Sequence, residues 1–423
     1  LNTHLSDAHC NLGNVLITLG NLKEAEVSTR KAIELNPGIA EAHSNLGGIL
    51  LNLGNLQEAE VSSRKAIELN PNYADAHYHL GTILLEIGNL QEAEASTRKA
   101  IELNPNYADA HYNLGNILEN QAKIEEAIIH WKNSVELNPD KEKAIITLAN
   151  FLCVNKEYDT AIKYLSKNKS NSCQSIYLSC LLSLDRQKDF DQKYKELSTT
   201  NACNANIGGI VEHAKIIYEK DYQSPFCNEA MQYIYIDKIN EDAFSTNHLN
   251  ELIMYNKRSE KVNKYQGLLT NGIQTSGNLF SLNYPYIKTI KKALEMKIDQ
   301  YKQKFKDSGQ GFINNWPENY ELRSWIISMN SGGFLAPHNH EYGWITGSFY
   351  LQVPKLYNHE EAGSIAFSYQ SPRYPKKGKN FNSIIKKIES RDIVIFPSSL
   401  FHQTIPFEST EERICFVFDL VQK

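Results

Sequence analysis

A pair of histidines separated by one residue is the first feature of this sequence that could do chemistry. His338 and His340 lie in the segment PHNHEYGW. Residues i and i+2 of a β-strand face the same side, so on a strand both imidazoles could reach one metal ion. Two further residues follow downstream: His402, just beyond the apolar run DIVIFP, and Arg413, eleven residues later. We therefore expect a metal site in this part of the chain.

The elements that must position these residues are short and rich in aromatic and β-branched residues. From about residue 224, alternation of apolar and polar residues replaces a helical period, which indicates strands. The expected strands are MQYIYID (231–237), LRSWIISM (322–329), ITGSFYLQV (345–353), GSIAFSY (363–369), DIVIFP (392–397) and RICFVFDL (413–420). Amphipathic helices are expected at 247–260 and 284–305. Many short strands with glycine and proline turns predict a sandwich or jelly roll.

The order of the histidines and the arginine resembles that of the iron- and 2-oxoglutarate-dependent oxygenases. In that family a His-x-acid pair on one strand is followed far downstream by a second histidine and, about ten residues later, by an arginine. The resemblance covers roughly residues 226–423 and implies a double-stranded β-helix, or jelly roll, with flanking helices. It also implies Fe(II) bound by His338, His340 and His402, with O2 as the oxidant. The cosubstrate 2-oxoglutarate would place its far carboxylate on Arg413.

Within this superfamily, the run from SWIISMNSGG to ERICFVF is similar to a group of oxygenases common in marine bacteria and phages. Members of that group carry an HNH motif followed by a strand like TGSFYL (346–351) here. Ser348 and Tyr350 alternate with Phe349 on this strand, so one set faces the pocket. We expect Ser348 and Tyr350 to contact the cosubstrate.

Two positions depart from the common pattern. His340 stands where the wider family has Asp or Glu, so the site would hold three neutral imidazoles instead of two histidines and one carboxylate. Cys415 stands where many relatives have serine, so one hydroxyl contact to the cosubstrate would be missing. A cupin, which shares the jelly roll and a His-x-His pair, is the alternative family. Cupins usually add a glutamate a few residues on, where Trp344 and Ile345 stand here.

The first half of the chain is built from a 34-residue repeat. The spacing holds for prolines 37, 71, 105 and 139, for histidines 9, 43, 77 and 111, and for glycines 13, 47, 81 and 115. The unit, with an inner Leu-Gly, a central Ala and a closing Pro, resembles the tetratricopeptide repeat (TPR) over about residues 1–139. A fifth, degenerate copy runs from 140 to about 169. Each copy predicts a helical hairpin, and stacked hairpins form an all-α solenoid.

One position in the first helix of each repeat could bind peptide. Asn11, Asn45, His79 and Asn113 occupy it in the four copies. In some TPR proteins an asparagine ladder there lines the concave face and binds a peptide backbone, because an amide both donates and accepts hydrogen bonds. The alternative is a set of solvated polar residues. The four periodic histidines are expected to pack between helices rather than to bind metal.

Three parts are expected: TPR repeats at 1–170, a helical capping and connecting segment at 171–225, and the oxygenase domain at 226–423. The stretch SPRYPKKGKNFNSIIKKIESR (371–391) interrupts the β pattern and is rich in lysine and arginine. It predicts a solvated loop and surface helix or, alternatively, a basic lid that favours an acidic substrate.

The composition argues against several classes of protein. A net charge of −5 does not suit general nucleic-acid binding, because a polyanion needs a basic surface. No apolar run is long enough to span a bilayer, and no signal peptide opens the chain. The seven cysteines form no CxxC pair, so reduced thiols in a cytoplasmic protein are expected. Because Leu1 falls inside a repeat, the chain is expected to be truncated.

The leading functional hypothesis is a dioxygenase that hydroxylates a protein or peptide side chain recruited by the repeats. One alternative is oxidation of a small or carrier-tethered molecule, with the repeats serving assembly. Another is a non-enzymatic TPR adaptor with a cupin-like metal domain. The adaptor is disfavoured because His402 and Arg413 are both present.

Overall fold

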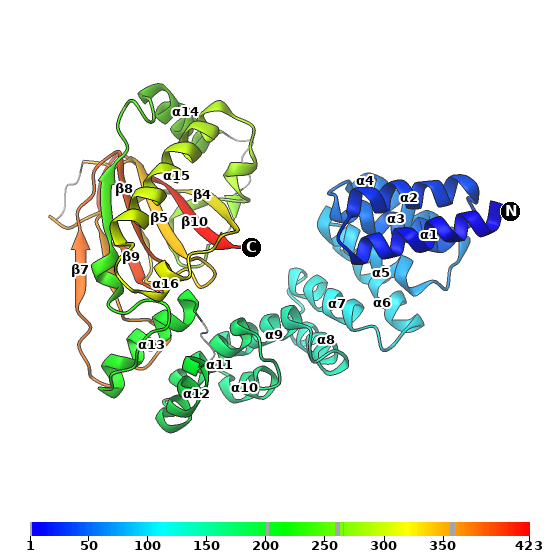
Figure 1. Ribbon diagram of the computed structural model, residues 1–423, viewed down its shortest axis with the longest axis horizontal. Coiled ribbons are helices and arrows are strands. Elements are labelled where there is room, and N and C mark those ends of the chain that lie inside the picture. Colours follow the sequence, from blue (N-terminus) through cyan, green and yellow to red (C-terminus); the bar gives the residue numbers. More distant parts are fainter. Residues whose placement is uncertain (1, 200–202, 259–262, 265, 356–359) are drawn as a thin grey trace. The chain divides into compact units, whose positions relative to one another are not determined.

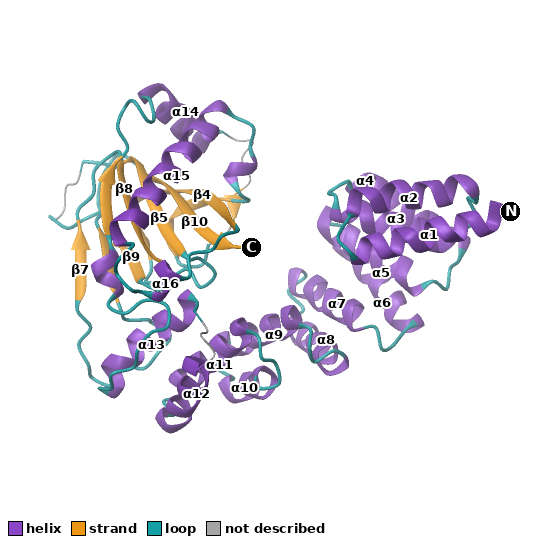
Figure 2. Cartoon of the chain, viewed as in Figure 1, coloured by secondary structure: helices purple, strands orange, loops and turns teal. Residues whose placement is uncertain are grey.

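The chain divides into two compact units, Leu1–Ile176 and Tyr177–Lys423, in a computed structural model that describes residues 2–199, 203–258, 263–264, 266–355 and 360–423. The first unit is helical, and the second combines helices with two antiparallel sheets (Figures 1 and 2). None of the helices in these ranges has both the length and the apolar character needed to cross a membrane. All seven cysteines are free thiols.

Five helical hairpins follow the 34-residue period of the sequence. They are α1 (Asn2–Thr18) with α2 (Leu22–Leu35), α3 (Ala40–Asn52) with α4 (Leu56–Leu69), α5 (Ala74–Ile87) with α6 (Leu90–Leu103), α7 (Ala108–Asn120) with α8 (Ile124–Leu137), and α9 (Glu142–Val154) with α10 (Tyr158–Leu165). The two helices of each hairpin pack against each other, and consecutive hairpins are in contact. The predicted all-α TPR solenoid is confirmed.

A glycine in each of the first four hairpins lets its two helices approach closely. A Cβ atom at Gly81 would lie 2.2 Å from the Thr97 hydroxyl oxygen on the second helix. At Gly115 a Cβ atom would lie 2.4 Å from the indole ring of Trp131. The glycine period of the sequence is therefore a packing requirement between helices.

The turn inside each hairpin needs a residue in the left-handed conformation. Gly20, Gly54 and Gly88 fill this position with φ values of 77°, 81° and 90°. Ala122 and Lys156 take the equivalent place in the fourth and fifth copies, with φ values of 60° and 61°. Because a side chain makes this conformation costly, the later copies carry backbone strain that the first three avoid.

The periodic histidines have a local structural partner. His43, His77 and His111 each place Nε2 within hydrogen-bond distance, 2.9–3.2 Å, of the carbonyl oxygen of the proline six residues earlier. These bonds tie the first helix of a repeat to the loop that precedes it.

Three more helices follow the repeats in the chain: α11 (Asn171–Ser183), α12 (Gln187–Thr199) and α13 (Ala205–Tyr218). α13 is buried along most of its length and includes the polar residues Glu212 and His213 among its buried side chains. α12 and α13 belong to the second structural unit, whose boundary lies at residue 176. The division into functional domains at 170 and 225 stays a prediction.

Two antiparallel sheets form the core of the second unit. The larger has seven strands in the order β1-β8-β5-β10-β4-β3-β2, and the smaller has three in the order β7-β6-β9. The strands are β1 (Tyr235–Lys238), β2 (Asn263–Lys264), β3 (Leu269–Thr275), β4 (Tyr320–Leu335), β5 (Ile345–Gln352), β6 (Ile365–Ser368), β7 (Ser383–Lys386), β8 (Asp392–Pro397), β9 (Phe401–Thr404) and β10 (Arg413–Gln422). This is the jelly-roll architecture predicted from the sequence.

Flanking helices close one face of the larger sheet. They are α14 (Thr246–Lys257), α15 (Pro285–Phe305) and the short α16 (Gly311–Asn314). α15 lies across the sheet (Figure 1), and its residues Ile290, Leu294 and Ile298 share one core with Phe349 and Phe416 of the strands. The apolar residues of α15 recur at helical spacing, which explains why this side of the helix is buried. Because α15 covers one face of the larger sheet, we expect the predicted metal site on the opposite face of that sheet.

The structure differs from the predicted elements in several places; strand β3, for example, was not predicted. The segment 231–237 begins as a 3-10 helix, η1 (Ala230–Tyr233), before β1. Residues 383–386 form strand β7 instead of a surface helix, because consecutive β-branched residues favour a strand. His402 lies on the short strand β9 rather than merely beyond β8.

Candidate metal centre

Two extended segments bring the three histidines together. His402 lies on β9, and His338 lies beyond the end of β4, where the two residues form an isolated bridge. The His338 N–H donates to the His402 carbonyl at 3.1 Å, and the His402 N–H donates to the His338 carbonyl at 2.8 Å. The His340 N–H donates to the Ser398 carbonyl at 3.2 Å. The His-x-His spacing suggested strand geometry at 338–340; in the structure these residues lie outside the named strands, and His338 forms an isolated bridge.

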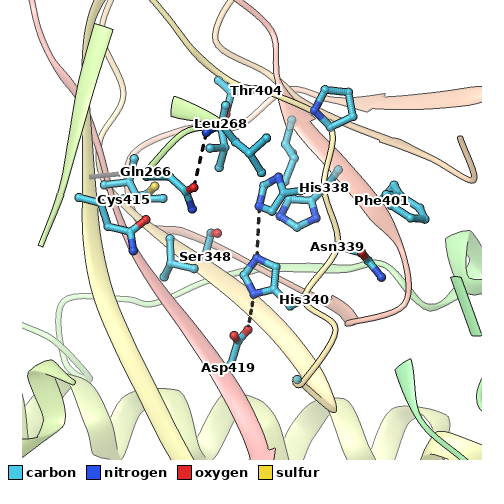
Figure 3. A pocket seen from close by; sticks show the side chains of 18 of the residues that line it. Gln266, Leu268, His338, Asn339, His340, Ser348, Phe401, Thr404, Cys415 and Asp419 are labelled. Atoms are coloured by element: carbon cyan, nitrogen blue, oxygen red, sulfur yellow. Dashed lines mark hydrogen bonds and ion pairs between the residues drawn. The ribbon is translucent and has the colours of Figure 1, made fainter. Parts of the chain in front are cut away.

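The three imidazoles converge, and Figure 3 shows the rings of His338 and His340 turned toward each other. The Nε2 atoms of His338 and His340 lie 3.3 Å apart, and one ring nitrogen from each histidine lies within 4.8 Å of the others. Nitrogens that share a metal at about 2.1 Å must lie roughly this close together. Across the described residues, this is the one group of His, Cys, Asp and Glu side chains that could hold a metal ion.

The outer ring nitrogens have oxygen partners. The Nδ1 atoms of His338 and His402 lie 2.8 Å and 3.4 Å from backbone carbonyl oxygens two residues earlier in the chain. The Nδ1 atom of His340 lies 2.7 Å from Oδ1 of Asp419. Because carbonyl and carboxylate oxygens accept hydrogen bonds, these contacts favour the tautomer with the proton on Nδ1, which leaves Nε2 with a lone pair for a metal.

Asp419 was not among the residues predicted from the sequence. Arg413, Cys415, Val417 and Asp419 alternate along β10, and all four line the same cavity. The sequence does contain a sign of its role. Asp419 is an acidic residue inside an otherwise apolar strand, an even number of residues from Arg413, so both side chains point to the same face. A carboxylate is costly to bury there without a partner.

Burial makes two of the histidines neutral. Burial, followed by the neighbouring His340, lowers the pKa of His338 to about 4. Burial also lowers the pKa of His402 well below its ordinary value, and the other two imidazoles add to the effect. Both rings are therefore uncharged at pH 7, which is the form that binds a metal.

Arg413 is a buried guanidinium that forms no ion pair with any carboxylate in the part of the chain that the structure describes. Its side chain is 2% exposed. Its Nε donates to the Gly363 carbonyl at 3.0 Å, and its guanidinium lies 4.9 Å from the centre of the Tyr350 ring. The Cys415 sulfur lies 3.9 Å from its Nη1. A buried charge is costly unless it is paired, so this site calls for an anionic ligand.

One cavity of about 510 Å³ contains the histidines and Arg413. Ser348 and Tyr350 of β5 line it as well, on the side of the strand opposite Phe349. Burial raises the pKa of Tyr350 to about 12, so its hydroxyl keeps its proton and can donate a hydrogen bond. The cavity thus joins a possible metal site to a possible anion site.

The basic segment 371–391 contributes one of its charges to this cavity. Arg373 lies at the lining and donates to Glu341 Oε1 at 2.6 Å. Lysines 377, 379 and 387 and Arg391 each form an ion pair with an acidic residue of the same unit. The segment therefore offers less free positive charge than its composition suggests, which weakens the lid hypothesis.

Helix α13 packs against the loops that carry the histidines. A Cβ atom at Gly209 would lie 2.8 Å from the Ser399 carbonyl oxygen and 3.2 Å from Nδ2 of Asn339, the residue between the paired histidines. His213 of the same helix accepts a hydrogen bond from the Ser371 N–H, at 3.2 Å, on the cavity lining. α13 thus supports the metal-site loops from behind.

The predicted peptide-binding positions lie on the first helices of the repeats: Asn11 on α1, Asn45 on α3, His79 on α5 and Asn113 on α7. Asn45 and Asn113 donate hydrogen bonds of 2.6 Å and 3.1 Å to side chains of the preceding repeat. The His79 ring lies 3.1 Å from the Ser44 hydroxyl, whereas Asn11 is exposed. The amide N–H groups of Asn45 and Asn113 are therefore already used in hydrogen bonds between neighbouring repeats.

Two parts of the chain match known protein families. Residues 323–419 match the family described as "Putative 2OG-Fe(II) oxygenase". Residues 6–39, 40–73, 64–95, 81–122 and 108–141 match tetratricopeptide-repeat families. No curated protein matches the chain.

Similar solved structures include several repeat proteins. PilF of Pseudomonas aeruginosa is 22% identical with a TM-score of 0.41, and the match covers 47% of this chain and 93% of PilF. A thermophilic TPR protein of Thermus thermophilus is 22% identical with a TM-score of 0.37, over 42% and 99% of the two chains. MamA of Desulfovibrio magneticus RS-1 is 24% identical with a TM-score of 0.33, over 38% and 92%.

The family matches follow the order of the two units, with the repeats before residue 142 and the oxygenase match at 323–419. The oxygenase match spans the three histidines, Arg413 and Asp419. The chain therefore carries tetratricopeptide repeats followed by a region, residues 323–419, that matches the family described as "Putative 2OG-Fe(II) oxygenase".

Proposed function

We propose that the second unit is a 2-oxoglutarate- and Fe(II)-dependent dioxygenase, and that it hydroxylates a side chain of a protein or peptide bound by the repeats. The observation that carries this proposal is one cavity that contains both three convergent imidazoles and a buried guanidinium. A metal site alone would suit many proteins, whereas the neighbouring Arg413 calls for an anionic ligand beside the metal.

His338, His340 and His402 would hold the iron. Three imidazoles suit Fe(II), and a set of three protein ligands leaves coordination positions for small molecules. When bound, iron supplies the activation of O2 that the oxidation of a C–H bond requires. The protein's own task is to keep each Nε2 lone pair directed at one point and to restrict water in the cavity.

Arg413 would bind the far carboxylate of 2-oxoglutarate. A guanidinium can donate two parallel hydrogen bonds to a carboxylate, and burial strengthens such a pair. The Tyr350 phenol and the Ser348 hydroxyl lie on the same cavity wall and can donate to the same ligand. The Cys415 thiol is a weaker donor than the serine common in relatives.

The repeats would recruit the substrate. Stacked hairpins offer an extended surface suited to a polypeptide, and Asn11, Asn45, His79 and Asn113 are the proposed contacts. The amide oxygens of the asparagines can still accept from a peptide backbone. A protein partner, rather than nucleic acid or a membrane, also fits the net charge of −5. The seven free thiols support a cytoplasmic location.

Release of succinate from 2-oxoglutarate in the presence of Fe(II) tests the oxygenase. The wild-type chain should turn over 2-oxoglutarate, and Arg413→Met should raise the KM for 2-oxoglutarate by about 100-fold, because it removes a buried charge partner. Arg323→Met is the matched control, since Arg323 is an exposed arginine of β4 paired with Glu321, and its KM should stay unchanged. Absence of turnover by the wild type with Fe(II) would contradict the oxygenase.

A peptide library tests the substrate class. Succinate release that rises with particular peptides, but not with free amino acids, would support protein hydroxylation. The double substitution Asn45→Ala and Asn113→Ala should then weaken peptide binding. Stimulation by small molecules alone would contradict recruitment of a polypeptide and would favour the small-molecule alternative.

A further inference from the structure

We infer that Asp419 is a positioning residue of the metal site, which acts through His340 by fixing the tautomer and the orientation of its ring. The inference rests on the proposed function only in requiring that His340 binds a metal. It concerns a carboxylate that would not touch the metal itself.

The sheet places Asp419 where its carboxylate can hold the ring. Asp419 of β10 lies directly opposite Thr346 of β5 in the strand register. Its Oδ1 accepts from Nδ1 of His340 at 2.7 Å and from the Thr346 hydroxyl at 2.7 Å (Figure 3 shows the first bond). The Thr346 hydroxyl also lies 2.7 Å from the Ser398 hydroxyl. Cross-strand register, rather than a flexible loop, therefore sets the position of the carboxylate.

Counting protons gives this network a direction. A threonine hydroxyl has one hydrogen, and Thr346 gives it to the carboxylate, so Ser398 must donate to Thr346. An ionised carboxylate only accepts, so the His340 bond requires the proton on Nδ1. The Nε2 lone pair is then free, and it faces the Nε2 atom of His338 at 3.3 Å.

His340 differs in this respect from the other two histidines. The Nδ1 atoms of His338 and His402 meet neutral backbone carbonyls, whereas that of His340 meets a carboxylate. Such an outer carboxylate raises the basicity of an imidazole ligand and holds its orientation. The indole of Trp325 also stacks on the His340 ring, with centroids 5.7 Å apart and planes at 23°, and this packing limits ring rotation.

The same carboxylate changes the charge of the site. Two histidines and one carboxylate form the usual facial set for Fe(II), and the carboxylate there binds the metal directly. Here three imidazoles converge, and a negative charge stands on the far side of one of them. Asp419 thus supplies, through His340, part of the negative charge that the three-histidine set lacks.

Titration with Co(II), followed by its visible absorption, tests the inference without relying on turnover. Asp419→Asn should weaken Co(II) binding by about 10- to 100-fold and alter the absorption bands, because an amide can donate to Nδ1 and move the proton to Nε2. Asp392→Asn is the control: Asp392 of β8 accepts from the Glu389 N–H and pairs with Lys238, and its loss should leave Co(II) affinity unchanged. Equal affinity of Asp419→Asn and the wild type would overturn the inference.

A second background separates positioning from a general structural role. In His340→Asp no imidazole remains for Asp419 to orient, so adding Asp419→Asn should cost little further Co(II) affinity. An equal loss in both backgrounds would overturn the inference. If Asp419→Asn does not fold, Thr346→Val keeps the test open. This variant retains the carboxylate but removes its second donor, and it should weaken Co(II) binding by a few fold; unchanged affinity would count against the inference.

The two proposals can fail separately. Co(II) binding by the wild type that is lost in His402→Ala identifies the three-histidine site. If the wild type does not bind Co(II), both the metal site and the role of Asp419 are wrong. If the wild type binds and Asp419→Asn binds equally well, the metal site stands and the role of Asp419 is wrong.

Discussion

The two units of this chain use histidine in opposite ways. In the repeats, three of the four periodic histidines bond to the carbonyl oxygen of the proline six residues earlier, and the same contact recurs from copy to copy. In the second unit, histidines from two distant segments meet at one point, and a bridge between those segments holds them there. The difference shows that long-range pairing of segments, not residue type, makes a histidine a candidate ligand.

The comparison extends to the way each unit is built. A repeat contacts mainly its neighbours, so a change in one copy should stay local. The candidate metal site draws on β4, β5, β9, β10 and α13, so a change in any of these should affect the positions of the histidines. The following predictions test this contrast, from the largest expected effect to the smallest.

Removing one histidine from each unit should have the most unequal result. His402→Ala should weaken Fe(II) binding by more than about 100-fold, because loss of a ligand should exceed the loss from an outer partner. His77→Ala removes a bond to the Pro71 carbonyl and should reduce stability by about 1 kcal/mol without affecting the metal. Anaerobic calorimetry and thermal unfolding measure the two effects. Similar metal affinity in both variants would break the comparison.

The second-largest difference between the units should come from adding a methyl group where a glycine lies against a neighbouring segment. At Gly209 the new Cβ would meet the backbone oxygen of Ser399, which cannot rotate away, so Gly209→Ala should destabilise the second unit by about 1–3 kcal/mol. It should also lower metal affinity, because Asn339 lies at the same contact. Gly81→Ala meets Thr97 within one repeat and should leave metal affinity unchanged. Intact metal binding in Gly209→Ala would contradict the supporting role of α13.

Acid should destabilise the second unit through its buried histidines. The pKa of His338 is about 4 in the folded chain and about 6.5 when unfolded, so the unfolded chain binds more protons between these values. Stability should therefore fall as pH decreases from about 6.5 to 4. His338→Gln should flatten this dependence in urea unfolding without metal. The repeats should show the same sign through His130, whose pKa burial lowers to about 4. If the free energy of unfolding of His338→Gln depends on pH as steeply as that of the wild type, groups other than His338 cause the acid destabilisation.

The smallest effect should be a stabilisation. Ala122 holds the left-handed turn position that glycine fills in the first three repeats. Ala122→Gly should relieve steric strain and stabilise the repeats by about 0.5–1 kcal/mol, whereas Gly88→Ala should destabilise them by a similar amount. Chemical denaturation measures both, and metal affinity should be unchanged in each. Loss of stability in Ala122→Gly would show that neighbouring contacts outweigh the turn strain.

The helices of the repeats could be predicted from the sequence almost completely. The 34-residue spacing of proline, histidine and glycine marks each turn and each close helix contact, because all of these contacts are local. The central strands of the second unit were also recognisable from alternation. Strands β7 and β9 were not predicted, because each has only four residues and shows no clear alternation of apolar and polar residues.

The candidate site could be predicted in part. His338, His340, His402 and Arg413 stand out by type and spacing, and the structure brings all four to one cavity. Asp419 was not predicted, because its role depends on which side chains lie beside it in the folded sheet. Gly209 did not either, because it lies in a helix far from the histidines in sequence and contacts their loops only in the folded chain.

The sequence by itself identified the candidate side chains for binding a metal and an anion, and it determined the solenoid, since residue type and short spacing are local properties. Tertiary structure alone decided how the site is completed. Strand register set Asp419 beside His340 and opposite Thr346, and the bridge between two segments aligned His338 with His402. These pairings depend on contacts between residues distant in the chain, whose free energies no single stretch of sequence contains.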